Sequence, residues 1–340
     1  MTGRQQIELR ELPEPTPEPG RAVVEIRYCG ICGTDLHAYQ SGQPYNPATC
    51  GHEWVETISG VGAGVDGLRE GDRVGIGVPP GCGQCPECRG GDAAHCTRVL
   101  MAMLGMGPFA GPHGGFAPSI AVDVARLYPV RRELTDEDAA LLEPVTVAIH
   151  ALRRTPLRLG DAAVVVGAGP IGLLVLQCAR IAGAGAVVVV EPEPQRARLA
   201  AELGATVVVD PRSESVDERV KEICGRRGPD IVFECAGVPA TIDQAVSLVR
   251  RGGTMSLVGF ATVPAEINPG SWLTREVRVV ASLGYVHEEF DVAMQLVADG
   301  RLRLKPLCTD TVGLDDLESA FQRLLSGAGD VKLLVDPHRA

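Results

Sequence analysis

The stretch from Ala163 to Glu191 constrains the fold more than any other part of the chain. It reads as a β-branched run, a glycine turn, an apolar run with a helical period, and a second β-branched run that ends in an acid. The turn has the pattern G-x-G-x-x-G at Gly167, Gly169 and Gly172, which in a strand–turn–helix–strand unit is typical of dinucleotide binding. The first glycine lets the chain turn sharply, the second lets backbone N–H groups approach a pyrophosphate, and the third lets helix and strand pack closely.

The helix after the turn would present unpaired N–H groups and its positive dipole end to the cofactor phosphates. Glu191 ends the second strand, where a carboxylate can accept hydrogen bonds from the adenosine ribose and repel a 2′-phosphate, so NAD is favoured over NADP. A tight turn in any α/β sheet is the alternative for the glycines alone. The uncharged run 162–179 has the length of a membrane span, but Gly167, Gly169 and Pro170 interrupt it, which favours a strand–turn–helix.

Composition indicates a globular protein of about two domains, because 45% of the 340 residues are hydrophobic and 22% are charged. The net charge is −11 and the basic residues are scattered, so binding to nucleic acid is not expected. The first 20 residues are polar, acidic and proline-rich and lack an export signal, so we expect a cytoplasmic protein that does not bind membranes. In that compartment the 11 cysteines are expected as thiols rather than disulfides.

The chain has two regions that differ in their predicted secondary-structure pattern. Up to Thr135, short strands at 21–28, 54–62 and 72–78 are separated by glycine and proline turns with little helix, which predicts a β-rich first domain. A helix is expected from Thr135 to Leu152, with Thr135 as its N-cap. From residue 161 strands and helices alternate, which predicts a doubly wound parallel sheet. Its strands are expected at 163–166, 186–190, 206–209, 230–233, 254–258 and 277–281, and its helices at 170–182, 193–203, 213–225 and 239–250. Two further helices, near 288–299 and 315–325, and a strand at 331–335 complete the chain.

A cysteine-rich segment has the pattern C-x2-C-x2-C-x7-C among glycines, with Cys82, Cys85, Cys88 and Cys96 as its cysteines. Four thiolates can complete a tetrahedral shell around zinc, and a shell filled by protein ligands is structural rather than catalytic. Disulfides, an iron–sulfur cluster and four unrelated thiols are the alternatives, although the spacing differs from the common ferredoxin patterns. We therefore predict a structural zinc lobe at about residues 80–97.

A candidate reaction centre lies upstream of this lobe, in the short segments GICGTDLH and GHE. A catalytic zinc needs three protein ligands and one open position. Cys32, His52 and a carboxylate would provide them, and the carboxylate could be Glu53 or the later Glu143. From spacing alone, an ordinary His–Glu pair and a redox-active C-x-x-C that ends at Cys32 are alternatives.

These motifs resemble, in order and spacing, those of the zinc-dependent medium-chain dehydrogenases, the superfamily of alcohol and polyol dehydrogenases. The resemblance rests on GICGTDLH, GHE, the four-cysteine segment, LEP and VGAGPIG, and it extends from about residue 20 to residue 335. The GHE and EP motifs are most similar to the branch of threonine, sorbitol and butanediol dehydrogenases. The resemblance implies an α/β fold with a GroES-like β domain at 1–147, a Rossmann domain at 148–285, and a C-terminal segment at 286–340 that returns to the first domain.

The resemblance also implies roles at the reaction centre. Cys32 and His52 would bind the catalytic zinc, with Glu53 and Glu143 exchanging as the remaining ligand when substrate or water enters. A second zinc would occupy the cysteine lobe, so the cofactors would be two zinc ions and NAD.

Two further side chains would handle the proton. Thr34 would hydrogen-bond the substrate alcohol, since a hydroxyl both donates and accepts. His37 would stand at the outer end of a proton relay that runs through the nicotinamide ribose, and an imidazole titrates near neutral pH. Zinc would make the alcohol more acidic, and the nicotinamide would accept the hydride.

On the cofactor side, the resemblance implies that Glu191 and Arg196 hold the adenosine ribose. The remaining cofactor contacts would come from the glycine turn and the nicotinamide side: Gly167, Gly169, Pro170, Ile171, Gly172, Val258, Gly259, Phe260, Leu283 and Gly284. The family forms dimers and tetramers, and the strand at 277–281 lies where its subunits pair, so a homodimer or homotetramer is expected.

The predicted function is therefore an NAD- and zinc-dependent dehydrogenase that interconverts a small secondary alcohol, diol or polyol and its ketone. A non-catalytic cofactor-binding relative and a zinc-free quinone reductase of the same superfamily are the alternatives, and the complete set of zinc ligands is evidence against both. One departure affects the substrate: the family's GGFAEY run reads GGFAPS at 114–119, which removes a backbone donor at Pro118 and a large ring at Ser119.

Overall fold

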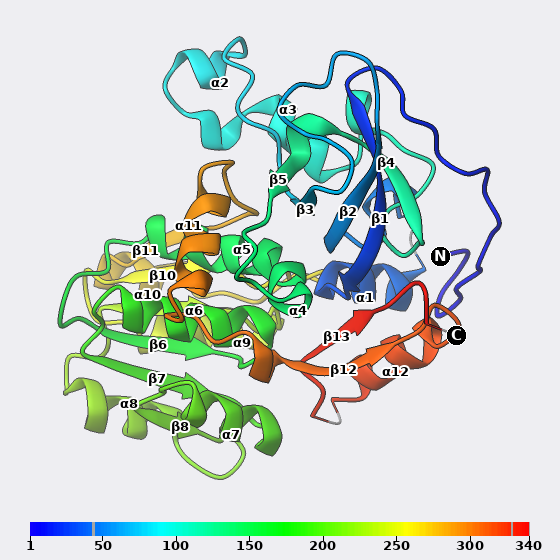
Figure 1. The fold of residues 1–340 in the computed structure, drawn as a ribbon. Helices are drawn as coiled ribbons and strands as arrows, with labels where there is room; N and C mark the ends of the chain where they lie inside the picture. The colour runs from blue at the N-terminus through cyan, green and yellow to red at the C-terminus, as the bar shows by residue number, and fades with distance from the viewer. Residues whose placement is uncertain (43–44, 328, 340) are drawn as a thin grey trace.

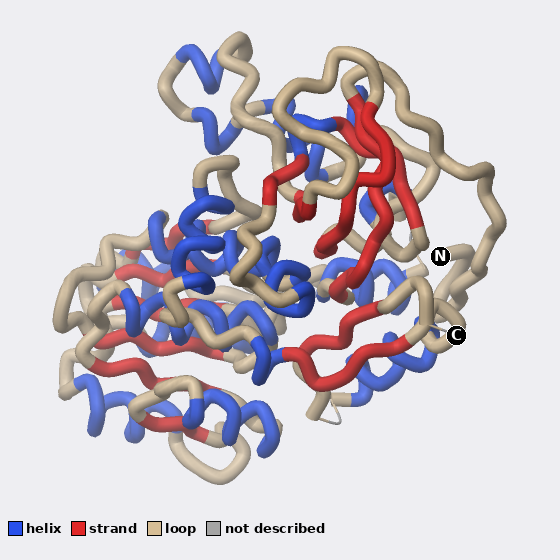
Figure 2. The backbone as a smooth tube through the Cα atoms, viewed as in Figure 1, coloured by secondary structure: helices blue, strands red, loops and turns tan. Residues whose placement is uncertain are grey.

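The computed structural model describes residues 1–42, 45–327 and 329–339. Its strands fall into two separate sheets, one at the upper right and centre of the view and one at the lower left (Figure 2). The lower-left sheet is flanked by helices, whereas the other is surrounded mainly by loops and short helices (Figure 1). The predicted α/β class, with a β-rich domain and a doubly wound parallel sheet, is confirmed.

The parallel sheet has the strand order β11-β10-β9-β6-β7-β8. Every neighbouring pair is parallel, and each strand begins and ends within one residue of the predicted range. The strands are β6 (Ala162–Val166), β7 (Ala186–Val190), β8 (Val207–Val209), β9 (Ile231–Glu234), β10 (Thr254–Leu257) and β11 (Arg278–Ala281). The order reverses between β6 and β9, so the sheet has its topological switch point beside the glycine turn that follows β6.

Helices cover both faces of this sheet because its strands are apolar on both sides. Val165 and Val189 pack into one core cluster, whereas their chain neighbours Val164 and Val188 pack into another. Side chains alternate across a strand, so the β-branched runs serve two cores at once. The helices are α6 (Pro170–Ile181), α7 (Pro194–Glu202), α8 (Val216–Cys224), α9 (Pro239–Leu248) and the unpredicted α10 (Pro269–Arg275).

The first sheet joins both ends of the chain. Its order is β12-β13-β1-β2-β3-β5, with β4 also paired to β1. The last strand runs antiparallel to the first, and Cys29 pairs with Val335. The strands are β1 (Arg21–Gly30), β2 (Glu53–Val61), β3 (Arg73–Ile76), β4 (Ser119–Asp123), β5 (Leu127–Pro129), β12 (Cys308–Val312) and β13 (Lys332–Val335). The short strands β4, β5 and β12 were not predicted.

Helices α5 (Leu142–Arg153) and α11 (Glu289–Ala298) lie side by side where the chain passes between the sheets (Figure 1). The helix predicted from Thr135 is in fact two, α4 (Asp136–Ala140) and α5 (Leu142–Arg153), and the predicted N-cap is present because Asp138 N donates to Thr135 Oγ1 at 3.1 Å. Helix α11 (Glu289–Ala298) packs against α5, and the buried His150 Nδ1 lies 2.9 Å from Glu289 Oε2. Helix α12 (Leu317–Ser326) lies beside β13.

The first half also contains three short helices that the sequence did not reveal. They are α1 (Gly33–Ser41), α2 (Pro86–Arg89) and α3 (Thr97–Met103). Helix α1 starts after Cys32, whose N–H donates to Asp35 Oδ2 at 3.0 Å in the manner of a capping box. Single 3-10 turns lie at Pro47–Thr49, Ala93–His95, Gly107–Phe109, Val124–Arg126 and Lys305–Leu307.

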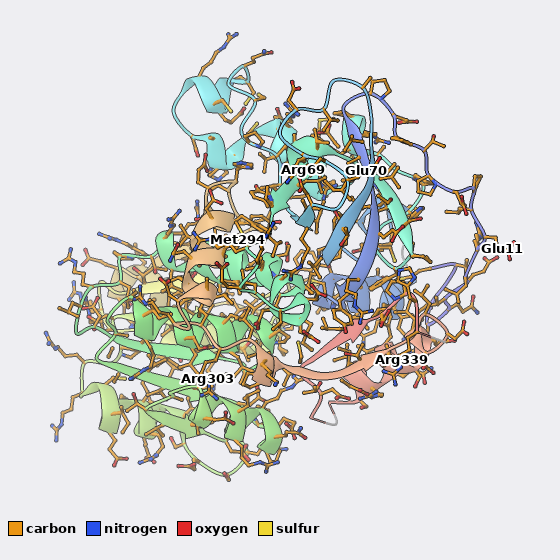
Figure 3. The ribbon with its side chains drawn as sticks, in the orientation of Figure 1. Glu11, Arg69, Glu70, Met294, Arg303 and Arg339 are labelled. Atoms are coloured by element: carbon orange, nitrogen blue, oxygen red, sulfur yellow. The ribbon has the colours of Figure 1, made fainter. Side chains whose placement is uncertain are left out.

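The surface is charged. Glu11, Arg69, Arg303 and Arg339 project outward, whereas Met294 of α11 is buried (Figure 3). The uncharged run 162–179 is divided between β6 and α6. Within 1–42, 45–327 and 329–339, no helix combines the length and the apolar character that a membrane crossing requires.

One buried acid is costly to this fold. Glu56 on β2 is fully buried, and neither of its carboxylate oxygens meets a hydrogen-bond partner among the described residues. Burial raises its pKa well above the usual value, and Arg126 only partly opposes this shift. The folded chain therefore disfavours the charged carboxylate, which in the unfolded chain is exposed to water.

We expect Glu56→Met to raise the free energy of unfolding by about 1–3 kcal/mol, because it removes an unsatisfied buried polar group. The native protein should lose stability as pH rises from the unfolded pKa of about 4.3 toward the raised folded pKa, so the gain should be larger at about pH 8 than at about pH 5. Urea unfolding at both pH values measures the free energy of unfolding of the native protein and of the variant. Glu25→Met, on the exposed side of β1, is the control. An equal loss of stability in the two variants would show that burying Glu56 costs the fold no free energy.

Candidate active site

Two groups of metal-ligating side chains come together in the described part of the chain. Cys32, His52 and Glu53 each place one ligand atom within 4.8 Å of the others. The four sulfur atoms of the cysteine lobe meet the same limit. The structure thus assembles both of the clusters that the sequence motifs suggested.

Strand pairing brings the first group together. Strands β1 and β2 are antiparallel and Gly30 pairs with Glu53, so Cys32, just past the end of β1, lies beside His52 and Glu53 at the start of β2. A Cβ atom on Gly30 would lie 2.4 Å from Glu53 Oε2. Glycine at this position therefore leaves the room that the carboxylate occupies.

His52 is oriented by a backbone carbonyl. Its Nδ1 lies 2.9 Å from Thr49 O, and since a carbonyl can only accept, Nδ1 carries the hydrogen and Nε2 is left as the ligand atom. Burial lowers the pKa of His52, but negative charge on Cys32, Asp35 and Glu143 raises it well above the usual value. The group therefore favours a positive charge, which suits a divalent cation.

Asp35 organises this group, and the sequence reading did not identify it. The side chain is fully buried and accepts hydrogen bonds from Cys32 N at 3.0 Å and Gly51 N at 3.3 Å. It also accepts from Tyr45 Oη at 3.0 Å. One carboxylate thus fixes the backbone on both sides of the cluster, as hydrogen-bond partners behind metal ligands commonly do.

Lys332 is the second residue that the sequence reading missed. Its Nζ lies 2.5 Å from Glu53 Oε2 and donates to Ile31 O at 2.8 Å, and both charged side chains are only 2% exposed. Burial lowers the pKa of Lys332, but Glu53 and Cys32 outweigh burial and raise it. Lys332 therefore stays charged and neutralises the acid beside the proposed metal position.

Glu143 lies near the group but outside it. The first turn of α5 carries it, and the cluster of three does not include it. Burial raises its pKa to about 7, although His52 lowers it, and Tyr285 interacts with its carboxyl group. The structure thus places Glu53 beside Cys32 and His52, and Glu143 lies nearby without joining the cluster.

Thr34 and His37 follow Cys32 in α1. The Thr34 hydroxyl is close to Tyr45 but meets no partner of hydrogen-bonding geometry among the described residues, although it is buried. A buried orphan hydroxyl next to a ligand cluster fits a hydroxyl group of a bound molecule. His37 is half-buried, and its ring lies 5.9 Å from that of Phe260, between centroids.

The glycine turn has the geometry that its pattern predicts. Gly167 has φ +94, a conformation that other residues rarely adopt, and a Cβ on Gly172 would lie 1.9 Å from Gly167 O. A Cβ on Gly169 would meet nothing within 4 Å, so this side of the turn is open to a ligand. Pro170 and Ile171 then begin α6, whose N-terminus faces the open side.

The two residues expected at the adenosine ribose are engaged with the protein itself. Glu191 accepts hydrogen bonds from Ala168 N at 2.7 Å and from Glu193 N at 2.8 Å. Arg196 donates to Asp330 O at 2.8 Å, while its Nε is buried without a partner in the described chain. The first contact braces the glycine turn, and the second joins α7 to the segment before β13.

The residues expected around the nicotinamide follow the carboxyl ends of two strands. Val258, Gly259 and Phe260 come after β10, and Leu283 and Gly284 after β11. Phe260 is 60% exposed and Leu283 is 70% exposed. Ligands of open parallel sheets bind beyond this edge, so these apolar side chains are available to a cofactor ring.

Backbone N–H groups favour the thiolate form of two of the lobe cysteines, Cys82 and Cys96. These groups donate to the sulfur atoms, from Gln84 N and Cys85 N to Cys82 Sγ at 3.4 and 3.3 Å, and from Cys82 N to Cys96 Sγ at 3.3 Å. The Gln84 and Cys85 hydrogen bonds lower the pKa of Cys82 below its usual value. All eleven cysteines of the chain are free, so the lobe is not closed by a disulfide.

Known proteins resemble this chain over nearly its whole length. Residues 18–132 match the alcohol dehydrogenase GroES-like domain, and residues 170–299 match the zinc-binding dehydrogenase domain. The (R,R)-butanediol dehydrogenase of Bacillus subtilis (strain 168) is 36% identical, over 98% of this chain and 98% of its own. The sorbitol dehydrogenase of the same strain is 32% identical, over 100% and 96%. The crystal structure of a putative zinc-binding dehydrogenase from Sinorhizobium meliloti 1021 bound to NADP is 30% identical, covers 99% and 97%, and superposes with a TM-score of 0.86.

We expect Lys332→Met to lower the free energy of unfolding by about 3–5 kcal/mol, because it leaves Glu53 charged, buried and unpaired. Urea unfolding measures the loss, and elemental analysis measures metal retention. The exposed Lys305→Met is the matched control and should change neither quantity. A stable Lys332→Met protein with its metal intact would show that the ion pair is dispensable.

We expect Cys88→Ser to reduce bound zinc from about two ions per chain to about one, because a tetrahedral shell needs all four sulfur ligands. The melting temperature should fall at the same time, since the lobe loses its central cross-link. Cys224→Ser, outside both groups, is the control. Unchanged zinc content in Cys88→Ser would rule out a metal in the lobe.

Proposed function

This chain belongs to the zinc-dependent medium-chain dehydrogenase family, and we propose that it oxidises a secondary alcohol, diol or polyol to a ketone, or catalyses the reverse reduction, with NAD as cofactor. The observation that carries the proposal is the assembly of Cys32, His52 and Glu53 within 4.8 Å of one another. The substrate class follows from the similarity to butanediol and sorbitol dehydrogenases.

Cys32, His52 and Glu53 would hold a zinc ion, with Glu143 as the carboxylate that exchanges with Glu53. When bound, zinc supplies Lewis acidity that makes a coordinated hydroxyl group more acidic, and NAD supplies the hydride acceptor. Lys332 offsets the charge of Glu53, which lets a second carboxylate lie close by without excessive repulsion. The four lobe cysteines would hold a second, structural zinc ion.

The chain's own groups would take up the proton of the alcohol. The Thr34 hydroxyl is buried and meets no partner of hydrogen-bonding geometry among the described residues, so it can accept a hydrogen bond from the substrate and donate another. His37 lies further along α1 and is half-buried, where it can accept a proton and release it to solvent. Asp35, between them, is committed to Cys32 N and Gly51 N and stays out of the transfer.

We favour NAD because Glu191 is the acid at the end of β7. Its two oxygens already accept backbone N–H groups, and each keeps a further lone pair for a ribose hydroxyl. A 2′-phosphate in the same place would face a carboxylate. Arg196 would have to leave Asp330 O to reach the cofactor.

A second copy of the chain would pair with β11. This strand forms one edge of the parallel sheet, and Val279 on it is exposed, as are Leu273 before it and Leu283 after it. An open edge strand with apolar neighbours is an unfavourable surface in a monomer. We propose a homodimer or homotetramer, working in the cytoplasm, where the eleven free thiols would stay reduced.

Cys32→Ser should abolish turnover and leave NAD binding intact, because the substitution removes a metal ligand and touches nothing at the glycine turn. The assay oxidises a panel of small alcohols, diols and polyols with NAD and follows NADH absorbance. Calorimetry measures NAD binding, and Cys308→Ser is the control. Full activity in Cys32→Ser, or no activity of the native zinc-loaded protein with any member of the panel, would refute the proposal.

A further inference from the structure

One aromatic contact crosses between the two halves of the molecule. His37 lies on α1 of the β domain, and Phe260 follows β10 of the parallel sheet. Their ring centroids are 5.9 Å apart with an interplanar angle of 64°, an edge-to-face arrangement. Phe260 is 60% exposed, so its ring does not belong to a core of its own domain.

The backbone that carries Phe260 is tightly held. A Cβ on Gly259 would lie 2.2 Å from Gly237 N, and a Cβ on Gly237 would lie 2.9 Å from Phe260 O. Gly259 N also donates to Glu234 O at 2.8 Å. Two glycines and the end of β9 thus fix the point from which the phenyl ring extends.

In the part of the chain that the structure describes, no charged group competes with this ring for His37. Among the described residues His37 has no hydrogen bond or ion pair, and burial lowers its pKa below the usual value. The acid on its own helix, Asp35, accepts from Cys32 N and Gly51 N. On the neighbouring α12, Glu318 accepts from Tyr39 Oη, and Arg4 of the N-terminal segment lies against the backbone of Gly42, at the end of α1.

We propose that Phe260 is a positioning residue that acts through His37: its ring, held out from the nucleotide-binding domain, packs against one side of the imidazole and shields that side from water. The inference rests on the proposed function, in which His37 takes up the proton of the alcohol. Shielding disfavours the charged imidazolium more than the neutral ring, so His37 stays able to accept a proton at lower pH. Phe260 thereby extends alcohol oxidation to more acidic conditions.

The test measures the pH dependence of kcat for alcohol oxidation in the zinc-loaded enzyme. Only neutral His37 accepts a proton, so the rate falls as pH drops through its pKa. In Phe260→Ala, water reaches the imidazole, and the acid limb should move to higher pH, toward the usual histidine value of about 6.5. Phe260→Leu keeps apolar cover and should shift it less. Val263→Ala, an equally exposed residue of the same loop that makes no ring contact with His37, should not shift it.

An NMR titration of His37 measures its pKa directly and does not depend on turnover. The His37 signal is assigned by its loss in His37→Asn, and its pKa should rise in Phe260→Ala. In the His37→Asn background, Phe260→Ala should have no further effect on the acid limb.

Two results would overturn the inference. A change in KM for NAD with an unmoved acid limb and an unmoved His37 titration would make Phe260 a cofactor contact only. A shift to lower pH would mean that the ring stabilises the imidazolium through a cation–π contact. If the native enzyme oxidises no alcohol, the proposed function fails by itself, while the NMR titration still decides whether Phe260 shields His37.

Discussion

A buried ion pair joins the last strand of the chain to the proposed reaction centre. Lys332 lies on the last strand, its Nζ is 2.5 Å from Glu53 Oε2, and both side chains are almost completely buried. Two charges withdrawn from water are tolerated only when each has a partner, so the strand that carries Lys332 must lie beside β1 for Glu53 to remain an anion. The pairing of β13 with β1 therefore belongs to the chemistry as much as to the fold.

The parallel sheet meets a different requirement. Its glycine turn lies at the switch point of the sheet, with an open side at Gly169 and the apolar side chains Phe260 and Leu283 at the same carboxyl edge. The metal-ligating group lies on the other sheet, near the end of β1. Hydride transfer requires the cofactor, bound at the parallel sheet, to contact the alcohol, bound at the metal-ligating group. The proposed reaction therefore takes place between the two sheets. The contact of Phe260 with His37 shows that side chains of the two halves reach each other there.

The sequence predicted the parallel sheet closely and the first sheet incompletely. Runs such as AVVV have a β-branched signal on both faces, whereas β4, β5 and β12 have only three to five residues each, too few for a clear periodic pattern. The motifs made Cys32, His52 and Glu53 candidate ligands, with Glu143 as the alternative carboxylate, and their roles followed from the family resemblance rather than from spacing alone. The motifs could not identify Lys332, which is 279 positions from Glu53 and reads as an ordinary surface lysine until the strands pair. Asp35 was missed because helix α1 was not predicted, and nothing in the local motif shows that this acid is buried beside the ligands.

The position of Lys332 also has a consequence for biosynthesis. The ribosome synthesises Cys32, His52 and Glu53 long before residue 332. In a nascent chain, the carboxylate of Glu53 therefore does not yet have Lys332 as its partner. The reaction centre becomes complete only when β13 has left the exit tunnel and inserted next to β1. The cysteine lobe has no such dependence, since its four cysteines lie within one short segment of the chain. The lobe therefore depends only on its own segment of chain, whereas the group of Cys32, His52 and Glu53 also depends on the last strand.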